Sequence, residues 1–142
     1  LLKLKDIVFV EGGNTFYLLK SMRACNFERV IRKLLKQGKV YIGVSAGSIV
    51  AGQTILPSVW RGEIRNKNRN TVGLTDLRGL NLVPFDIVVH YDRHPEFADL
   101  IKQKIKNPKK RAKKLRILTD EQALLVQGKE TMLIGQGEQI VV

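Results

Sequence analysis

Cysteine and histidine are scarce in this 142-residue chain, and so are long apolar runs. The single cysteine, Cys25, excludes an internal disulfide framework and suits a reducing, cytoplasmic setting; we expect it to be a small buried side chain. No His/Cys/Asp/Glu grouping has metal-ligand spacing, so we expect no metal and no cofactor. No apolar run approaches the roughly 18 residues that a membrane span requires, so no membrane partner is expected.

Acidic residues are also few, with 13 Asp and Glu against 25 Lys and Arg, which gives a formal net charge of +12. Much of this charge lies in Lys102–Arg116, a segment without acidic residues. Taken alone, it suggests a nucleic-acid site. No aromatic residue interleaves the charges to stack on bases. We therefore favour a solvated helix face and a basic turn at Asn107-Pro108, and consider nucleic acid an unlikely partner.

The first third of the chain has a strand–helix–strand pattern. Asp6–Val10 and Lys39–Val44 are short apolar runs typical of buried strands. Between them, Thr15 resembles an N-cap for a first helix, and a second helix pattern covers Phe27–Gln37. Continuous apolar strands that alternate with helices predict a parallel sheet with helices on its faces.

Further along, residues 54–84 are polar and suggest irregular or short antiparallel structure. The remaining predicted helices are Ser48–Gln53 and Pro95–Lys106, and the remaining predicted strands are Phe85–His90, Leu115–Thr119, Ala123–Gln127, Thr131–Gly135 and Gln139–Val142.

The pentapeptide Gly43-Val44-Ser45-Ala46-Gly47 directly follows a predicted strand and precedes a predicted helix. In that context Gly-x-Ser-x-Gly is a candidate nucleophile elbow, a tight turn that exposes its serine at the end of the strand. It is equally compatible with a plain turn of small, closely packed residues. The pentapeptide alone leaves both interpretations open.

A second glycine turn, Glu11-Gly12-Gly13-Asn14, also ends a predicted parallel strand, so it should lie on the same side of the sheet as Ser45. Gly12 and Gly13 can approach a substrate closely and, together with the N–H of Ala46, could form an oxyanion hole. The alternative is a turn that only requires positive φ. A nucleotide loop is not supported, because neither the Gly-x-Gly-x-x-Gly nor the P-loop pattern is present.

A serine nucleophile needs a base and a group that orients the base. His90 ends a predicted strand, whereas His94 follows in a loop and is expected to be solvated. Asp120 and Glu121 follow another predicted strand and could supply the acid, or could form an ordinary polar turn. The order Ser, His, acid differs from the Ser, acid, His order of α/β-hydrolases.

Four segments occur in the order and spacing of the peptidase E family, which includes dipeptidase E (aspartyl dipeptidase) and cyanophycinase-like serine peptidases. They are IVFVEGGNTFYLL (Ile7–Leu19), GVSAGSIV (Gly43–Val50), GLNLVPFDIVVHYD (Gly79–Asp92) and LTDEQALLV (Leu118–Val126). The resemblance covers essentially the whole chain. Gly-Gly-Asn-Thr together with Gly-x-Ser-Ala-Gly is far more specific than either motif alone.

This resemblance implies a class I glutamine amidotransferase-like fold of the flavodoxin type, a three-layer α/β sandwich with a mostly parallel sheet. Residues 1–142 would form one such domain, without the N-terminal strand–helix units of the family. The implied activity is cytoplasmic, cofactor-free serine-type hydrolysis of small peptides, with dipeptides that carry an N-terminal Asp as one implied substrate, and family members suggest a homodimer. The alternatives are an enzyme of different specificity and a non-catalytic binding protein.

The resemblance also implies roles for individual residues. Ser45 matches the nucleophile and His90 the general base. Asp120 is the acid by spacing, with Glu121 as the fallback, since relatives often carry Glu at the position of Asp120.

Other positions match the walls of the family's site. Gly13 and Ala46 match the oxyanion donors, while Gly12 and Asn14 belong to the substrate-binding turn. An acidic substrate side chain requires a cation, most suitably an arginine fork. Of the loop arginines Arg61, Arg65 and Arg93, we favour Arg93, with a plain surface arginine as the alternative.

Overall fold

The computed structural model describes residues 2–64, 69–106, 114–138 and 140–141. After a 3-10 turn (Leu2–Leu4), the chain forms β1 (Ile7–Val10), α1 (Thr15–Ala24), α2 (Phe27–Lys36) and β2 (Val40–Gly43). The two strands pair in parallel, with Ile7 opposite Val40 and Val10 opposite Gly43. The strand–helix–strand unit that the sequence predicts is therefore present.

The rest of the chain adds three helices, a second parallel strand pair with a short antiparallel strand beside it, and a hairpin. The elements are α3 (Ala46–Ala51), α4 (Leu56–Ile64), β3 (Asp86–Val88), α5 (Pro95–Lys106), β4 (Leu115–Ile117), β5 (Gln122–Gln127), β6 (Glu130–Gly135) and β7 (Ile140–Val141). Strands β3 and β4 are parallel, β7 joins β4 antiparallel, and β5–β6 is an antiparallel hairpin.

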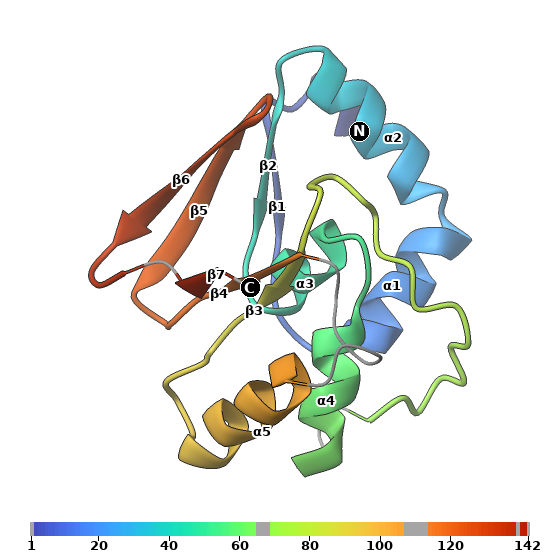
Figure 1. The fold of residues 1–142 in the computed structure, drawn as a ribbon. Coiled ribbons are helices and arrows are strands. Elements are labelled where there is room, and N and C mark those ends of the chain that lie inside the picture. Colours follow the sequence, from blue (N-terminus) through green and yellow to red (C-terminus); the bar gives the residue numbers. More distant parts are fainter. Residues whose placement is uncertain (1, 65–68, 107–113, 139, 142) are drawn as a thin grey trace.

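Helices α1 and α2 lie beside the β1–β2 pair, and the β5–β6 hairpin lies on its other side (Figure 1). The buried side chains of β1, Val8 and Val10, share one core with residues of α1, α2 and α3. The alternate residues of β1 and β2 remain exposed, because successive side chains of a strand point to opposite faces. These exposed apolar residues are Ile7, Phe9, Val40 and Ile42.

The predicted α/β architecture with parallel strands is confirmed. The described strands form three hydrogen-bonded sheets, β1–β2, β3–β4–β7 and β5–β6, instead of one continuous ladder. Each strand of the two parallel pairs is only three or four residues long, so it has few backbone N–H and C=O groups with which to pair with a further strand. A candidate site residue nevertheless follows the carboxyl end of each of the strands β1, β2, β3 and β4.

Residues 54–84 contain a helix that the sequence pattern did not predict, α4 (Leu56–Ile64). Its proline, Pro57, stands in the first turn, where a missing N–H is tolerated. Trp60 is buried on one face and Arg61 beside it. The apolar stripe of this helix is short and is followed by polar residues, so the sequence pattern does not indicate a helix here. The antiparallel structure expected in the segment is limited to a bridge between Thr54 and Arg78.

Two local predictions were wrong. The N-cap of α1 is Asn14, whose side chain accepts a hydrogen bond from the N–H of Tyr17, while Thr15 is the first helical residue and is buried. Cys25 is exposed instead of buried, because it ends α1 at the C-cap.

The basic segment Lys102–Arg116 lies partly in α5, where Lys104 pairs with Glu63 of α4. The predicted turn at Asn107-Pro108 lies outside the described residues. Among the residues that are described, no helix combines the length and the apolar character that crossing a bilayer demands.

Candidate active site

Ser45 stands between β2 and α3 in a backbone conformation that L-residues rarely adopt, with φ 54° and ψ −111°. A serine at an N-cap usually accepts a hydrogen bond from its own helix, but the Ser45 side chain makes no such cap bond. Its Oγ lies 3.0 Å from Nε2 of His90 instead. The turn therefore directs the hydroxyl away from the helix and toward a potential base.

The glycines around Ser45 are required by close packing. A Cβ on Gly47 would lie 2.1 Å from the carbonyl oxygen of Val10, and one on Gly43 would lie 2.6 Å from the backbone of Gly47. The hydroxyl of Tyr41 donates to the Gly47 carbonyl at 2.7 Å, and that of Ser48 donates to the Gly43 carbonyl at 2.6 Å. Both interpretations of the pentapeptide hold, since it is a turn of tightly packed small residues that also presents its serine.

His90 follows β3 and also has a positive φ, 61°. Its side chain is only 16% exposed and contacts two groups: Nε2 faces Ser45 Oγ, and Nδ1 contacts Oδ1 of Asp120. Non-glycine residues in this backbone region store strain, and such strain concentrates at functional sites. Both Ser45 and His90 show it, and they face each other.

Asp120 follows β4, and each oxygen of its carboxylate has a separate partner. Oδ1 contacts His90, while Oδ2 accepts from Nε of Arg93 at 2.8 Å. Burial acts to raise the pKa of Asp120, but the hydrogen bonds from His90 and Arg93 and the charges of these groups outweigh it and lower the pKa. Of the two candidate acids, the one that contacts His90 is Asp120.

The glycine turn after β1 lies against the serine turn. A Cβ on Gly12 would come within 3.1 Å of the Ser45 Cβ and 3.4 Å of its Oγ. Gly13 has φ 134° and an open flank, with nothing within 4 Å of a Cβ placed there. Ala46 begins α3, where the first N–H groups have no partner within a helix. These positions suit backbone donors around a bound carbonyl.

Asn14 links this turn to a cavity of about 380 Å³. Its Nδ2 donates to the carbonyl of Arg69 at 2.9 Å, so the side chain acts as a tether as well as a helix cap. The cavity walls are mostly apolar, with Glu63 and Arg69 as the charged members. They are formed by Phe16, Val59, Gly62, Glu63, Arg69, Asn70, Leu74, Thr75 and Leu77.

The arginines expected near a substrate are placed differently. Arg93 is occupied by Asp120. Arg61 is buried in α4, with its guanidinium 5.3 Å from the centre of the Phe97 ring. Arg65 lies outside the described residues. His94 lies at the start of α5, where its carbonyl accepts from the N–H of Phe97.

Two contributors to the site were missed in the sequence. Tyr41 supports the elbow from within β2, and Asp92 accepts the backbone N–H of Asp120 at 3.2 Å. Tyr41 has no sequence signal beyond its place in an apolar strand. Asp92 had one, since it lies two residues after the candidate base.

The candidate residues thus follow the four successive strands of the two parallel pairs: Gly12 after β1, Ser45 after β2, His90 after β3 and Asp120 after β4. An α/β fold that presents a serine to a histidine, and that histidine to a carboxylate, defines the class of proteins with a nucleophile-elbow site. The described residues bring together no group of three or more His, Cys, Asp or Glu side chains that could hold a metal ion.

The family model of peptidase family S51 matches residues 1–134, and the chain belongs to this family. An uncharacterized peptidase of Listeria monocytogenes is 30% identical over 131 residues, covering 92% of this chain and 61% of that protein. A peptidase E of Nostoc is 38% identical over 91 residues, covering 64% of this chain and 34% of that protein.

The fold agrees with this family. A crystal structure of a protein assigned to peptidase E, from Listeria monocytogenes EGD-e, superposes with a TM-score of 0.76 at 25% identity and covers 96% of this chain and 62% of that chain. The chain thus spans about three fifths of the length of the Listeria proteins it matches.

Proposed function

We propose that this chain carries a serine peptidase site that hydrolyses short peptides, with Ser45 as nucleophile, His90 as general base and Asp120 as the acid that orients it. The observation that carries the proposal is the hydrogen-bonded chain from Ser45 Oγ to His90 Nε2, at 3.0 Å, and from His90 Nδ1 to the Asp120 carboxylate. Membership of peptidase family S51 supports the same chemistry.

In the first half of the proposed reaction, Ser45 Oγ attacks the scissile carbonyl carbon while its proton passes to Nε2 of His90. The carbonyl oxygen becomes an oxyanion, which the backbone N–H groups of Gly13 and Ala46 stabilise. His90 then delivers the proton to the leaving amine, the C–N bond breaks, and an acyl-serine ester remains.

In the second half, water attacks the ester and gives its proton to His90, which returns it to Ser45 as the acid product leaves. Asp120 stays ionised throughout. Its contact with Nδ1 holds the tautomer in which Nε2 is free to accept the proton from Ser45. Every proton is returned, so the cycle consumes only peptide and water.

For the substrate we propose dipeptides with an N-terminal Asp. The cavity beside Asn14 has room for a side chain, and Arg69 on its wall offers positive charge. Since Arg93 and Arg61 have other contacts, Arg69 is the cation that we assign to an acidic substrate group.

A panel of Asp-X, isoaspartyl and neutral dipeptides tests the proposal, with product amino acids measured by chromatography. We expect turnover of Asp-X dipeptides that disappears in Ser45→Ala. In Arg69→Gln, turnover of Asp-X dipeptides should fall to the level of neutral dipeptides, while turnover of neutral dipeptides stays unchanged. Turnover of neutral dipeptides alone would contradict the substrate assignment but keep the peptidase. Hydrolysis that persists in Ser45→Ala would contradict the site itself.

A further inference from the structure

Arg93 contacts the acid of the site through two nitrogens. Its Nε and Nη2 lie 2.8 and 2.6 Å from the same oxygen, Oδ2 of Asp120. The other oxygen, Oδ1, is left to Nδ1 of His90. Each carboxylate oxygen therefore has its own hydrogen-bonding partner, and together the two contacts fix the rotation of the carboxylate about its last bond.

The chain brings Arg93 to this place by a tight turn directly after the base. The N–H of Arg93 donates to the carbonyl of His90 at 3.3 Å, which folds the side chain back toward β4. In the same turn, Asp92 accepts the backbone N–H of Asp120. One short turn thus carries the base, a group that holds the Asp120 backbone and a group that holds its side chain.

Without such contacts, little else would hold the carboxylate. Asp120 lies beyond the end of β4, and its side chain is 33% exposed. An exposed aspartate samples several side-chain rotamers, of which only some reach His90. The lowered pKa of Asp120, which Arg93 helps to produce, also keeps the carboxylate ionised and able to accept the hydrogen from Nδ1.

We infer that Arg93 is a positioning residue of this site: it holds the Asp120 carboxylate toward His90, so that the imidazole stays directed at Ser45. The arginine touches neither the serine nor the proposed oxyanion donors; it acts through Asp120. A lysine would provide the charge but not the planar fork. The activity measurements for this inference rest on the proposed peptidase function, so a second measurement independent of turnover is included.

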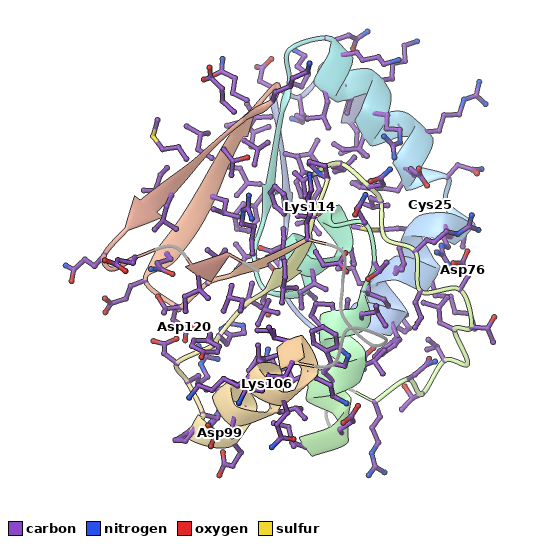
Figure 2. All side chains as sticks on the ribbon, viewed as in Figure 1. Cys25, Asp76, Asp99, Lys106, Lys114 and Asp120 are labelled. Atoms are coloured by element: carbon purple, nitrogen blue, oxygen red, sulfur yellow. The ribbon has the colours of Figure 1, made fainter. Side chains whose placement is uncertain are left out.

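The chain offers a matched control for the same type of ion pair. Arg78 makes a fork with Asp76, with Nε at 3.0 and 3.1 Å from the two oxygens and Nη2 at 2.6 Å from one. Asp76 and Asp120 lie on opposite sides of the molecule in Figure 2. Losing the Arg78 fork removes a surface ion pair without touching the site.

The kinetic test compares Arg93→Gln, Arg93→Lys and Arg78→Gln with the unmodified chain on an Asp-X dipeptide across a range of pH. We expect Arg93→Gln to lower kcat roughly 10- to 100-fold with KM nearly unchanged, because a misoriented base slows the chemical step. Arg93→Lys should recover part of the lost kcat. Arg78→Gln should have the same kcat as the unmodified chain.

The pH profile adds a readout that a purely structural role would not change. Arg93 helps to lower the pKa of Asp120, so removing its positive charge favours proton uptake at the site. The acid limb of kcat/KM should therefore move to higher pH in Arg93→Gln. A raised KM with unchanged kcat in Arg93→Gln would instead make Arg93 a substrate ligand. Kinetics identical to those of the unmodified chain at every pH would make it a plain surface arginine. Either result overturns the inference.

Proton NMR of the imidazole N–H separates this inference from the proposed function. We expect a low-field Nδ1–H signal of His90, assigned by its loss in His90→Gln, that broadens or disappears in Arg93→Gln and persists in Arg78→Gln. If the unmodified chain hydrolyses no peptide but the signal still depends on Arg93, the function fails and the positioning role stands. A signal equally sharp in Arg93→Gln overturns the positioning role.

Discussion

The two halves of the site are held by different forces. On the serine side the supporting groups are neutral and tightly packed: Gly47 lies against the Val10 carbonyl, and Tyr41 donates to the Gly47 carbonyl. On the acid side the supporting groups are charged and partly exposed, with Arg93 51% and Asp120 33% exposed. The position of the proposed nucleophile is thus set by steric packing, and that of the proposed base by electrostatic contacts, which respond to pH.

The largest effect is expected on the acid side. Asp120→Asn leaves the shape of the site intact but removes the charge that holds the His90 tautomer, and in other hydrolases of this type such a change lowers kcat by about 10⁴-fold. Steady-state kinetics on an Asp-X dipeptide measures it. The control is Glu121→Gln, which should stay within about twofold of the unmodified chain. Loss in Glu121→Gln with activity retained in Asp120→Asn would move the acid by one position.

On the serine side, Gly47→Ala tests packing. The new methyl would overlap the Val10 carbonyl at 2.1 Å, and we expect unfolding in urea to show a loss of at least about 3 kcal/mol. Gly128→Ala is the matched control, since Gly128 has φ 61° but nothing within 4 Å of a Cβ. Its cost should be about 1 kcal/mol, from backbone strain alone. Equal losses in the two variants would contradict a steric origin.

A smaller effect is expected from Tyr41→Phe, the neutral counterpart of Arg93→Gln. The change removes the 2.7 Å hydrogen bond to the Gly47 carbonyl and should cost about 1 kcal/mol of unfolding free energy. Because no charge is involved, the acid limb of kcat/KM should not move. A shift of that limb as large as in Arg93→Gln would erase the distinction between the two halves of the site.

The smallest effect is the contribution of Asp120 to stability at acid pH. Its pKa is lowered in the folded state, so its stabilisation is present above the unfolded value of about 3.9 and is lost as pH falls through the folded value. Because the pair is partly exposed, we expect less than about 1 kcal/mol. Urea unfolding between neutral and acid pH should show a shallower acid loss in Asp120→Asn. An unchanged slope would mean that the ion pair adds nothing to folding.

Much of the site could be predicted from sequence because parallel strands bring their carboxyl ends together. Ser45, His90 and the Gly12-Gly13 turn each follow a strand that the apolar pattern identifies, and the structure brings them side by side. The choice between Asp120 and Glu121 could not be made by residue type. It depends on the turn after β4, in which the N–H of Thr119 donates to Gln122 and the Asp120 carboxylate contacts His90.

The role of Arg93 could not be read from the sequence for a similar reason. Three residues after a candidate base, an arginine is equally suited to bind an acidic substrate or to face solvent. Only the hydrogen bond that closes the His90–Arg93 turn directs it to Asp120. Helix α4 was missed because its buried stripe, which includes Pro57 and Trp60, is short and interrupted.

The central claim, that Ser45 is a nucleophile activated by His90, is tested most directly by covalent labelling with a fluorophosphonate probe. We predict that the folded chain is labelled at the peptide containing Ser45, as located by mass spectrometry, that Ser45→Ala is not labelled, and that labelling of His90→Gln is at least about 100-fold slower. Absence of labelling in the folded chain, or labelling that is as fast in His90→Gln as in the unmodified chain, would contradict the claim.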